Sequence, residues 1–184
     1  MDDKHMEFEN PVRMKELNPE ETLKRIGILE DSVFCDIGAG SGIFSVAAAG
    51  LTKNRVYALE INDDMISVIK EKALGNSFTN IEAVKVDPES FHMADNCVDI
   101  ALMVTVLHEI ADKPTFLKNV KKLLKDDGKA AVIEFHKRTT PMGPPPAHRI
   151  GRDEVTEEMK KIGLTVIDDF NLGENFYCLV FGNL

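Results

Sequence analysis

Short apolar runs alternate with amphipathic segments along most of the chain. An apolar run that ends in turn residues is typical of a buried strand, whereas apolar residues at intervals of three and four are typical of a helix. This pattern predicts strands at about 32–37, 55–60, 81–86, 98–105 and 129–135, and helices at about 42–51, 63–74 and 112–125.

The order of these elements indicates the fold class. Strands that alternate with helices form a parallel sheet with right-handed crossovers, and helices cover both of its faces. The uninterrupted apolar run at 98–105 agrees with this arrangement, because a central parallel strand is buried on both sides. We expect a doubly wound, Rossmann-like α/β fold.

The C-terminal part of the chain differs from the rest. A helix is predicted at about 153–162, and two β-rich runs follow at 164–170 and 175–181, joined by turn residues at 171–174. So short a link predicts an antiparallel hairpin. The expected sheet therefore has seven strands, is mostly parallel, and ends in this C-terminal hairpin.

The remaining segments complete a single expected domain over residues 1–184. Residues 1–17 form an N-terminal segment whose pattern is irregular or weakly helical, and Asn18-Pro19 predicts a helix start with asparagine as the cap. The acidic run Asp126-Asp127-Gly128 is predicted to be a turn before the strand at 129–135.

A glycine-rich turn follows the first predicted strand. That strand ends near Asp36, and Gly38, Gly40 and Gly42 then alternate with other residues before an apolar helix begins. Glycine permits positive φ angles and lets a ligand approach the backbone, and the helix start offers unpaired N–H groups. The dinucleotide fingerprint G-x-G-x-x-G would place its third glycine at Ile43, so the spacing here is different.

Three acidic residues are expected at one edge of the sheet. Asp36, Glu60 and Asp87 each stand at the carboxyl end of a predicted strand, and ligands of open α/β sheets bind at that edge. Each acid taken alone is also compatible with an ordinary strand end or helix cap. Together they predict a site for a ligand with hydroxyl groups or positive charge.

Four stretches match the motifs of one family. They are the D-x-G-x-G-x-G run at 36–42, Tyr57-Ala58-Leu59-Glu60-Ile61-Asn62, the acid-rich string at 87–99, and Val104-Thr105-Val106-Leu107-His108-Glu109-Ile110. The chain thereby resembles the class I S-adenosylmethionine-dependent methyltransferases over roughly residues 20–183. The string at 87–99 is similar to that of the ubiquinone and menaquinone biosynthesis C-methyltransferases, although Pro88 and His92 depart from it.

The resemblance implies S-adenosyl-L-methionine as cofactor and S-adenosyl-L-homocysteine as product. It implies that Glu60 accepts hydrogen bonds from the ribose hydroxyls, that Ile61 flanks the adenine ring, and that Asp87 meets the adenine amino group. The cofactor-binding residues that it implies are Asp36, Gly38, Ala39, Gly40, Gly42, Glu60, Ile61, Asp87, Pro88 and Val104. The expected reaction is in-line transfer of a methyl group to a small-molecule acceptor.

The acceptor side offers two candidate bases. His108 follows the fourth predicted strand and His136 follows the fifth, and histidine titrates in the range that general acid–base chemistry needs. His108 is equally interpreted as a residue that caps or packs at a helix start, and His136 as an exposed loop residue. Both interpretations are left open.

The proline-rich loop at 139–151 is the least ordinary stretch. Loops of this length in a compact domain are often lids or binding elements, and the prolines favour an extended course. His148 and Arg149 within it are candidates to bind an anionic acceptor. The alternative is a stiff connector with solvated basic ends.

Composition narrows the remaining choices. The net charge is −9, which disfavours nucleic acid as a partner, and no membrane span or signal peptide is expected, so a cytoplasmic location is predicted. Cys35, Cys97 and Cys178 are scattered and are expected to be buried hydrophobes, with no metal site. A homodimer is left open, as are two other functions: a non-catalytic binding or regulatory protein, and an NAD-dependent oxidoreductase.

Overall fold

A seven-stranded sheet forms the centre of the molecule. The computed structural model describes residues 9–87 and 90–183. The strands lie in the order β3-β2-β1-β4-β5-β7-β6. Their bounds are β1 (Phe34–Ile37), β2 (Val56–Glu60), β3 (Ile81–Lys85), β4 (Val98–Val104), β5 (Leu124–Phe135), β6 (Leu164–Leu172) and β7 (Phe176–Asn183).

The pairing of the strands confirms the predicted fold. β1 to β5 are parallel to one another, and β7 is antiparallel to both β5 and β6. β1 and β4 are neighbours in the sheet, although β2 and β3 come between them in sequence. The strand order reverses at this point, and ligands of doubly wound folds bind there. The sheet is therefore mostly parallel and ends in the C-terminal hairpin that the sequence predicts.

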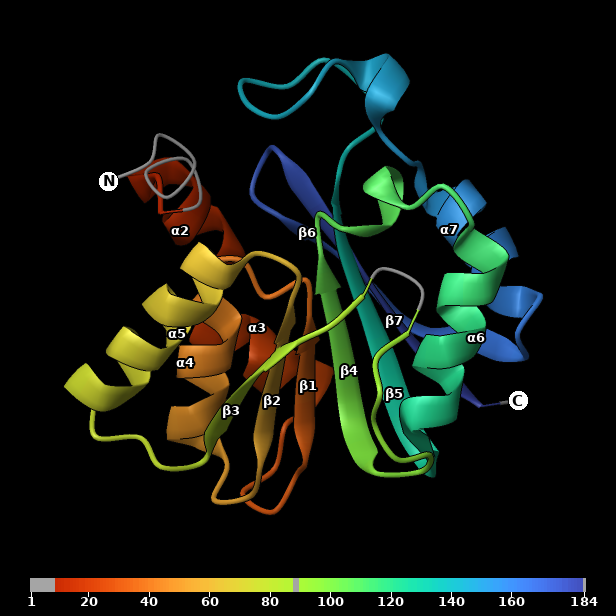
Figure 1. Ribbon diagram of the computed structural model, residues 1–184. Helices are drawn as coiled ribbons and strands as arrows, with labels where there is room; N and C mark the ends of the chain where they lie inside the picture. The colour runs from red at the N-terminus through yellow and green to blue at the C-terminus, as the bar shows by residue number, and fades with distance from the viewer. Residues whose placement is uncertain (1–8, 88–89, 184) are drawn as a thin grey trace.

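Helices cover both faces of the sheet, as Figure 1 shows. One layer contains α3 (Pro19–Ile26), α4 (Ile43–Leu51) and α5 (Asp63–Gly75), and the other contains α6 (Lys113–Leu123) and α7 (Arg152–Lys160). Two short 3-10 helices, η1 (Leu107–Glu109) and η2 (Pro146–His148), lie at the carboxyl edge. Hydrophobic clusters fill the space between sheet and helices on each side. Among the described residues, no helix has the length and apolar character needed to cross a membrane.

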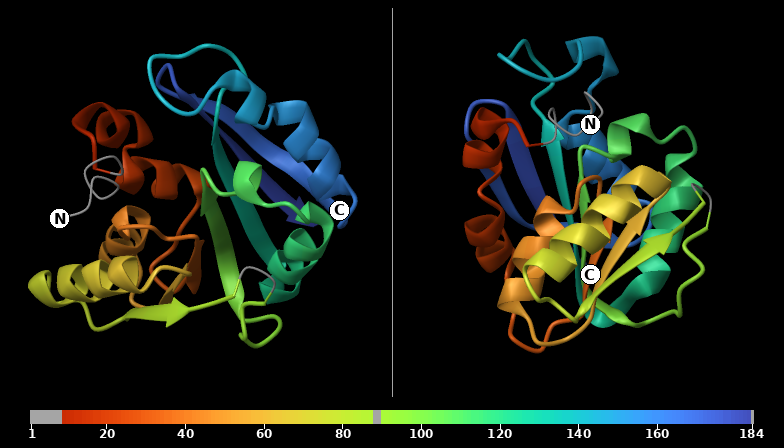
Figure 2. Two further views of the ribbon diagram at one scale, coloured as in Figure 1. Left: turned by 45° about the horizontal axis from the view of Figure 1, so that its top comes forward. Right: turned by 60° about the vertical axis from the view of Figure 1, so that its left-hand side comes forward.

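The N-terminal segment is more regular than expected. Its described part contains helix α2 (Pro11–Leu17). Asn10 caps this helix, because its side chain accepts hydrogen bonds from the N–H groups of Val12 and Arg13. The Glu16 carboxylate accepts hydrogen bonds from the hairpin link, at Glu174 N and from both nitrogens of Asn175. These bonds hold α2 beside the hairpin at the carboxyl edge of the sheet, as the two views in Figure 2 show.

The predicted turn at Asp126-Asp127-Gly128 is wrong in detail. The residues belong to β5, and the register moves from Val98 opposite Leu124 to Ile100 opposite Lys129. The extra residues form a bulge, and a side chain at Gly128 would come within 3.0 Å of backbone atoms of Lys125 and Val98. Turn-like composition therefore marks an irregularity within a strand here.

We expect the central strand to carry much of the stability. Leu102 in β4 is fully buried, so Leu102→Ala should lower the free energy of unfolding by about 2–5 kcal/mol, because the cavity would not collapse completely. Leu74→Ala is the matched control, since Leu74 is 82% exposed and its truncation should change stability by less than about 0.5 kcal/mol. Urea denaturation measures both values, and equal losses would contradict the assigned burial.

Candidate functional site

The glycine turn between β1 and α4 is a bare segment of backbone. Gly38, Gly40 and Gly42 have φ angles of 72°, 53° and 76°, which lie in the left-handed region that other residues rarely adopt. A Cβ atom at Gly38 would lie 2.5 Å from Val106 Cγ2, and one at Gly42 would lie 2.8 Å from Ile69 Cγ1. The turn therefore requires glycine for its conformation and for its close contacts.

Asp36 lies at the end of β1 and is only 2% exposed. Its carboxylate accepts a hydrogen bond of 2.6 Å from Ser45 Oγ in the first turns of α4. Burial raises the pKa of Asp36 to about 6, and the hydrogen bond from Ser45 opposes this rise. Asp36 thus fastens the helix to the strand at the turn.

Glu60 joins the end of β2 to the glycine turn. Its Oε2 accepts a hydrogen bond of 2.7 Å from Gly40 N, and its Oε1 accepts bonds from the N–H groups of Ile61 and Asn62 at 2.9 and 3.0 Å. Three backbone donors therefore hold a nearly buried carboxylate at the edge of the sheet. Oε2 keeps room for a further donor, because it has two lone pairs and accepts one bond, whereas Oε1 already accepts two.

Ser41 leaves a polar atom unsatisfied inside the turn. Its side chain is buried, and its Oγ has no hydrogen-bond partner among the residues that the structure describes. The Ser41 carbonyl accepts a bond of 2.8 Å from Lys72 Nζ. Buried hydroxyl groups are nearly always paired, so this one indicates a place where a ligand or water completes the site.

The other implied cofactor residues lie at or near the same edge. Ile61 is 57% exposed, an unusual state for a large apolar side chain beside a buried acid, and Asp87 has a side chain that is 79% exposed. Val104 ends β4 and is half-buried, and Ala39 is buried within the turn. Pro88 lies outside the described residues. An exposed apolar side chain between acids suits a ring that carries hydroxyl or amino groups.

The segment that follows β4 contacts the glycine turn. Thr105 has a φ of 54°, which is strained for a β-branched residue. Its N–H donates to Ile133 O at 2.7 Å, and its Oγ1 accepts a bond from Arg13 Nη2 at 3.2 Å. Strained residues of this kind persist where the surroundings hold them, and they concentrate at functional sites.

His108 is paired with a buried acid from the next strand. Its Nδ1 lies 2.8 Å from Glu134 Oε2, and its backbone N–H donates to Glu134 Oε1 at 3.1 Å. Glu134 is 1% exposed, and its hydrogen bond raises the pKa of His108 above the usual value. The sequence patterns assign Glu134 no role, although it is the single acid of the predicted strand at 129–135 and was an available signal.

His136 has different surroundings. Its Nδ1 lies 3.4 Å from Arg152 Nη1, and its ring lies against Tyr177. Burial and the charges of Arg152 and Arg138 lower the pKa of His136. A cavity of about 640 Å³ between α7, η2 and the end of β4 is lined by His108 and His148 but not by His136. The structure therefore selects His108 as the histidine that faces this cavity.

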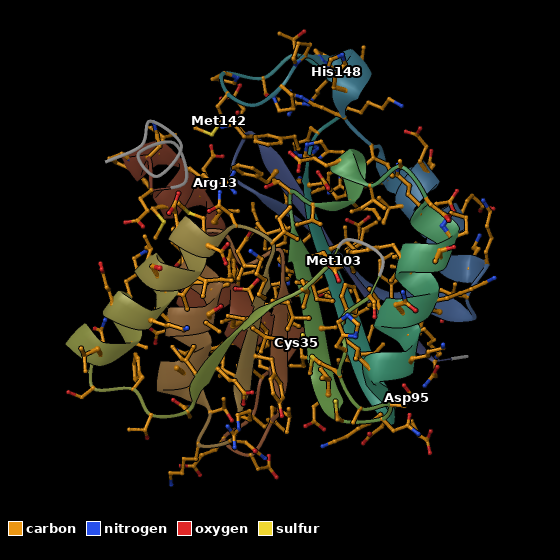
Figure 3. All side chains as sticks on the ribbon, in the orientation of Figure 1. Arg13, Cys35, Asp95, Met103, Met142 and His148 are labelled. Atoms are coloured by element: carbon orange, nitrogen blue, oxygen red, sulfur yellow. The ribbon has the colours of Figure 1, made fainter. Side chains whose placement is uncertain are left out.

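Arg149 corrects the expectation of an anion-binding pair. Its guanidinium is buried, and all three nitrogens donate within the loop: to Thr140 Oγ1 and to the carbonyls of His136, Arg138, Met142 and Pro144, at 2.6–2.9 Å. It borders the cavity beside α7, but its guanidinium is taken up by these acceptors and holds the loop in shape. His148 is exposed on η2 at the top of the molecule in Figure 3.

The loop at 139–151 is also tied down by packing. A Cβ atom at Gly143 would lie 2.5 Å from the ring of Phe135, so the backbone rests directly on that ring. Met142 packs against the hydrophobic cluster that contains Phe135. Figure 3 shows Met142 on the side of the loop toward α2. These contacts favour the stiff connector over a free lid.

A family model described as a methyltransferase domain matches residues 28–175. The chain belongs to the methyltransferase domain family. The match spans the glycine turn, all three edge acids, His108, and the strands up to the hairpin. The resemblance to class I S-adenosylmethionine-dependent methyltransferases is thereby confirmed, and S-adenosyl-L-methionine is the cofactor that this family implies.

Known proteins agree with this assignment. The chain is 27% identical over 124 residues to the ubiquinone/menaquinone biosynthesis C-methyltransferase UbiE of Hahella chejuensis, a match that covers 66% of this chain and 50% of that protein. The chain thus spans about half the length of the curated relatives that it matches.

Two solved structures have the same fold. A SAM-dependent methyltransferase from Aquifex aeolicus superposes with a TM-score of 0.91 and 24% identity, over 97% of this chain and 96% of that one. A type 11 methyltransferase from Sulfolobus solfataricus gives 0.77 and 28% identity, over 90% and 91% of the two chains. The first likeness confirms the fold.

Burial of Asp36 should make stability fall as the pH rises. The carboxyl has a pKa of about 6 in the folded protein and 3.8 as its ordinary value, so the folded state binds more protons between these pH values. The resulting loss between pH 4 and 7 is roughly 2–3 kcal/mol. Asp36→Asn removes the titration and keeps the acceptor for Ser45, so its stability relative to the parent protein should rise over that range.

Urea denaturation from pH 4 to 7 measures this difference. The exposed Asp31 provides the matched control, because Asp31→Asn should leave the pH dependence of the parent protein in place. A difference between Asp36→Asn and the parent that stays constant with pH would contradict the raised pKa.

Proposed function

We propose that the protein transfers a methyl group from S-adenosyl-L-methionine to a small-molecule acceptor by in-line displacement. The observation that carries this proposal is the glycine turn with Glu60 bonded to Gly40 at its edge, in a chain of the methyltransferase domain family. When bound, the cofactor supplies a methyl group on a positively charged sulfur, which activates it toward a nucleophile.

The residues present fit this cofactor. The unpaired Oγ of Ser41 lies within the turn, and the absence of side chains at Gly38 and Gly42 leaves backbone that a ligand can approach. Glu60 provides carboxylate oxygens for hydroxyl donors, and Ile61 provides an exposed apolar surface for a ring. We assign the amino-acid part of the cofactor to the glycine turn and the ribose to Glu60.

The charge of the edge favours the same cofactor. Glu60 ends β2 and Asp87 lies just past β3 at this edge, and acids attract the sulfonium and ammonium groups of S-adenosyl-L-methionine. The pyrophosphate of a dinucleotide is repelled by the same charges. This comparison, together with the glycine spacing, argues against the NAD-dependent oxidoreductase.

The acceptor side suits a small molecule. The cavity beside His108 has a volume of about 640 Å³, within the range of about 300–1,000 Å³ that is usual for small-molecule sites. The segment after β4 contacts the glycine turn through Val106 and lines this cavity through His108, so one short segment links the proposed cofactor site to the cavity. The protein then acts by holding the two reactants close together and excluding water.

Calorimetry with S-adenosyl-L-methionine and S-adenosyl-L-homocysteine tests the proposal. Each should bind to one site and raise the melting temperature, because a ligand at 100 times its Kd stabilises the folded state by about 2.7 kcal/mol. NAD should do neither. Turnover on an acceptor panel, followed by release of S-adenosyl-L-homocysteine, separates an enzyme from a non-catalytic binding protein. If neither adenosyl compound binds, the proposal fails.

Glu60→Gln should weaken binding of S-adenosyl-L-homocysteine by about 5- to 150-fold, or about 1–3 kcal/mol, because an amide replaces the charged acceptor of the ribose hydroxyls. Glu82→Gln is the matched control, since Glu82 lies on the outer strand β3 and pairs with Arg55 in an exposed position. Calorimetry gives both affinities, with circular dichroism to show that each variant is folded. An unchanged Kd in Glu60→Gln would refute the assigned role.

A further inference from the structure

The segment after β4 connects the two halves of the site. Val106 packs against the backbone of Gly38 in the glycine turn, and His108, two residues further along, lines the cavity beside α7. His108 therefore borders a cavity that can hold an acceptor, and it lies two residues from the contact with the glycine turn. The surroundings of His108 determine what it can do there.

Glu134 fixes the hydrogen that His108 carries. A carboxylate only accepts hydrogen bonds, so the ring nitrogen 2.8 Å from Glu134 Oε2 must be the one that carries hydrogen, which is Nδ1. The second oxygen of Glu134 accepts the backbone N–H of the same histidine. The imidazole is thus held in both position and tautomer by one buried side chain.

The other ring nitrogen is left as the basic one. In the neutral ring Nε2 then has a lone pair, and the nearby Oε1 of Glu109 lies 4.0 Å away, beyond hydrogen-bond distance. The side chain of Glu109 is 76% exposed, so it does not enclose the ring. Nε2 is free to meet a group that enters the cavity.

We propose that His108 is the general base of the methyl transfer and that Glu134 is its positioning residue. The inference rests on the proposed function and extends it to the acceptor, which must carry a dissociable proton on the atom that is methylated. Phenols, enolisable carbon acids, amines and thiols meet this requirement, and an atom without a proton does not.

The step balances as a displacement with proton removal. The acceptor atom uses an electron pair to form the new bond to the methyl carbon, and the bond from that carbon to sulfur breaks with its pair left on the sulfur. The proton of the acceptor atom passes to His108 Nε2. The resulting imidazolium is stabilised by the Glu134 carboxylate, in the way that a buried acid supports a catalytic histidine in other enzymes.

Other charged groups lie beside His108 or line the same cavity, and of these Glu109 raises the pKa of His108 and Lys113 lowers it. The acids come from η1 and α7: Glu109, Asp153, Glu154, Glu157 and Glu158. Basic groups come from α6 and the segments after β5: Lys113, Lys137 and His148. Lys137 is paired with Glu154, and Lys113 donates to a backbone carbonyl. Glu134 alone makes two hydrogen bonds to His108, so its removal should have the largest effect.

Nuclear magnetic resonance titration of the histidines in the full chain provides a test that needs no acceptor. Glu134→Gln keeps the size of the side chain and removes its charge, so the pKa of His108 should fall below that in the parent protein. Glu109→Gln is the matched control, an identical change beside the same ring, and should shift the pKa of His108 less. An unchanged pKa in folded Glu134→Gln would overturn the proposal.

Turnover on a panel of a catechol, a hydroquinone, a primary amine and a thiol provides the second test. His108→Gln should lower kcat by at least about 100-fold on an acceptor that the parent protein methylates, which is the usual contribution of a general base. Activity of the parent protein should fall as the pH drops through the pKa of His108, since the base must be neutral. In Glu134→Gln this fall in activity should occur at lower pH, in agreement with the lowered pKa of His108. The maximal activity at higher pH should also be lower than in the parent protein.

The outcomes separate this proposal from the proposed function. His108→Gln and Glu134→Gln should bind S-adenosyl-L-homocysteine with a Kd within about threefold of that of the parent protein. Glu109→Gln should have a kcat within about threefold of the parent value. If the cofactor binds and His108→Gln retains full kcat, the base is refuted and the methyltransferase stands. If the parent protein binds neither adenosyl compound, the proposed function itself fails.

Discussion

The site depends on one close contact, the packing of Val106 against the bare backbone of Gly38. A Cβ atom at Gly38 would overlap the Val106 side chain, so only glycine lets the segment after β4 lie against the turn after β1. This contact lies beyond the carboxyl ends of β1 and β4, which are neighbours in the sheet at the point where the strand order reverses. The position of His108 follows from it, because the histidine is two residues beyond Val106.

Three buried acids at this edge are stabilised in three different ways. Glu60 is held by backbone N–H groups, Glu134 by both a backbone N–H and a histidine ring, and Asp36 by a single hydroxyl. The pKa of Asp36 is raised because burial outweighs that single bond. The number of hydrogen-bond donors thus distinguishes Asp36, which attaches a helix to the sheet, from Glu60 and Glu134, whose charged forms are stabilised by two or more donors.

The fold could be predicted from the sequence because its signals are local. Apolar periodicity, the glycine spacing and the short link before β7 each depend on neighbouring residues, and the strand order follows from the handedness of the crossovers. The bulge in β5 could not be predicted, because Asp126-Asp127-Gly128 has the composition of a turn and only the pairing with β4 makes it part of a strand. The helix in the N-terminal segment was likewise underestimated.

Sequence motifs indicate the proposed cofactor side of the candidate site but not the pairing on its acceptor side. The glycines and the edge acids lie in contiguous motifs, whereas the pairing of His108 with Glu134 joins residues 26 apart in sequence. Arg149 shows the same limit from the other direction. Its basic character suggested a ligand contact, but backbone carbonyls of its own loop and of the residues just before it accept its hydrogen bonds, and a residue pattern does not show them.

Two arginines near Phe135 hold the segments beside the cavity in place. Arg149 lies 5.2 Å from the centre of that ring, and Arg13 of α2 lies 6.0 Å from it and bonds to Thr105. Opening the loop would strip a buried guanidinium of its carbonyl partners, at a cost of about 1–3 kcal/mol for each bond lost. The loop is therefore a fixed part of the cavity beside α7, which His108, the exposed His148 and acidic side chains of α7 also line. Under the proposed function, the charge and shape of this fixed wall select the acceptor.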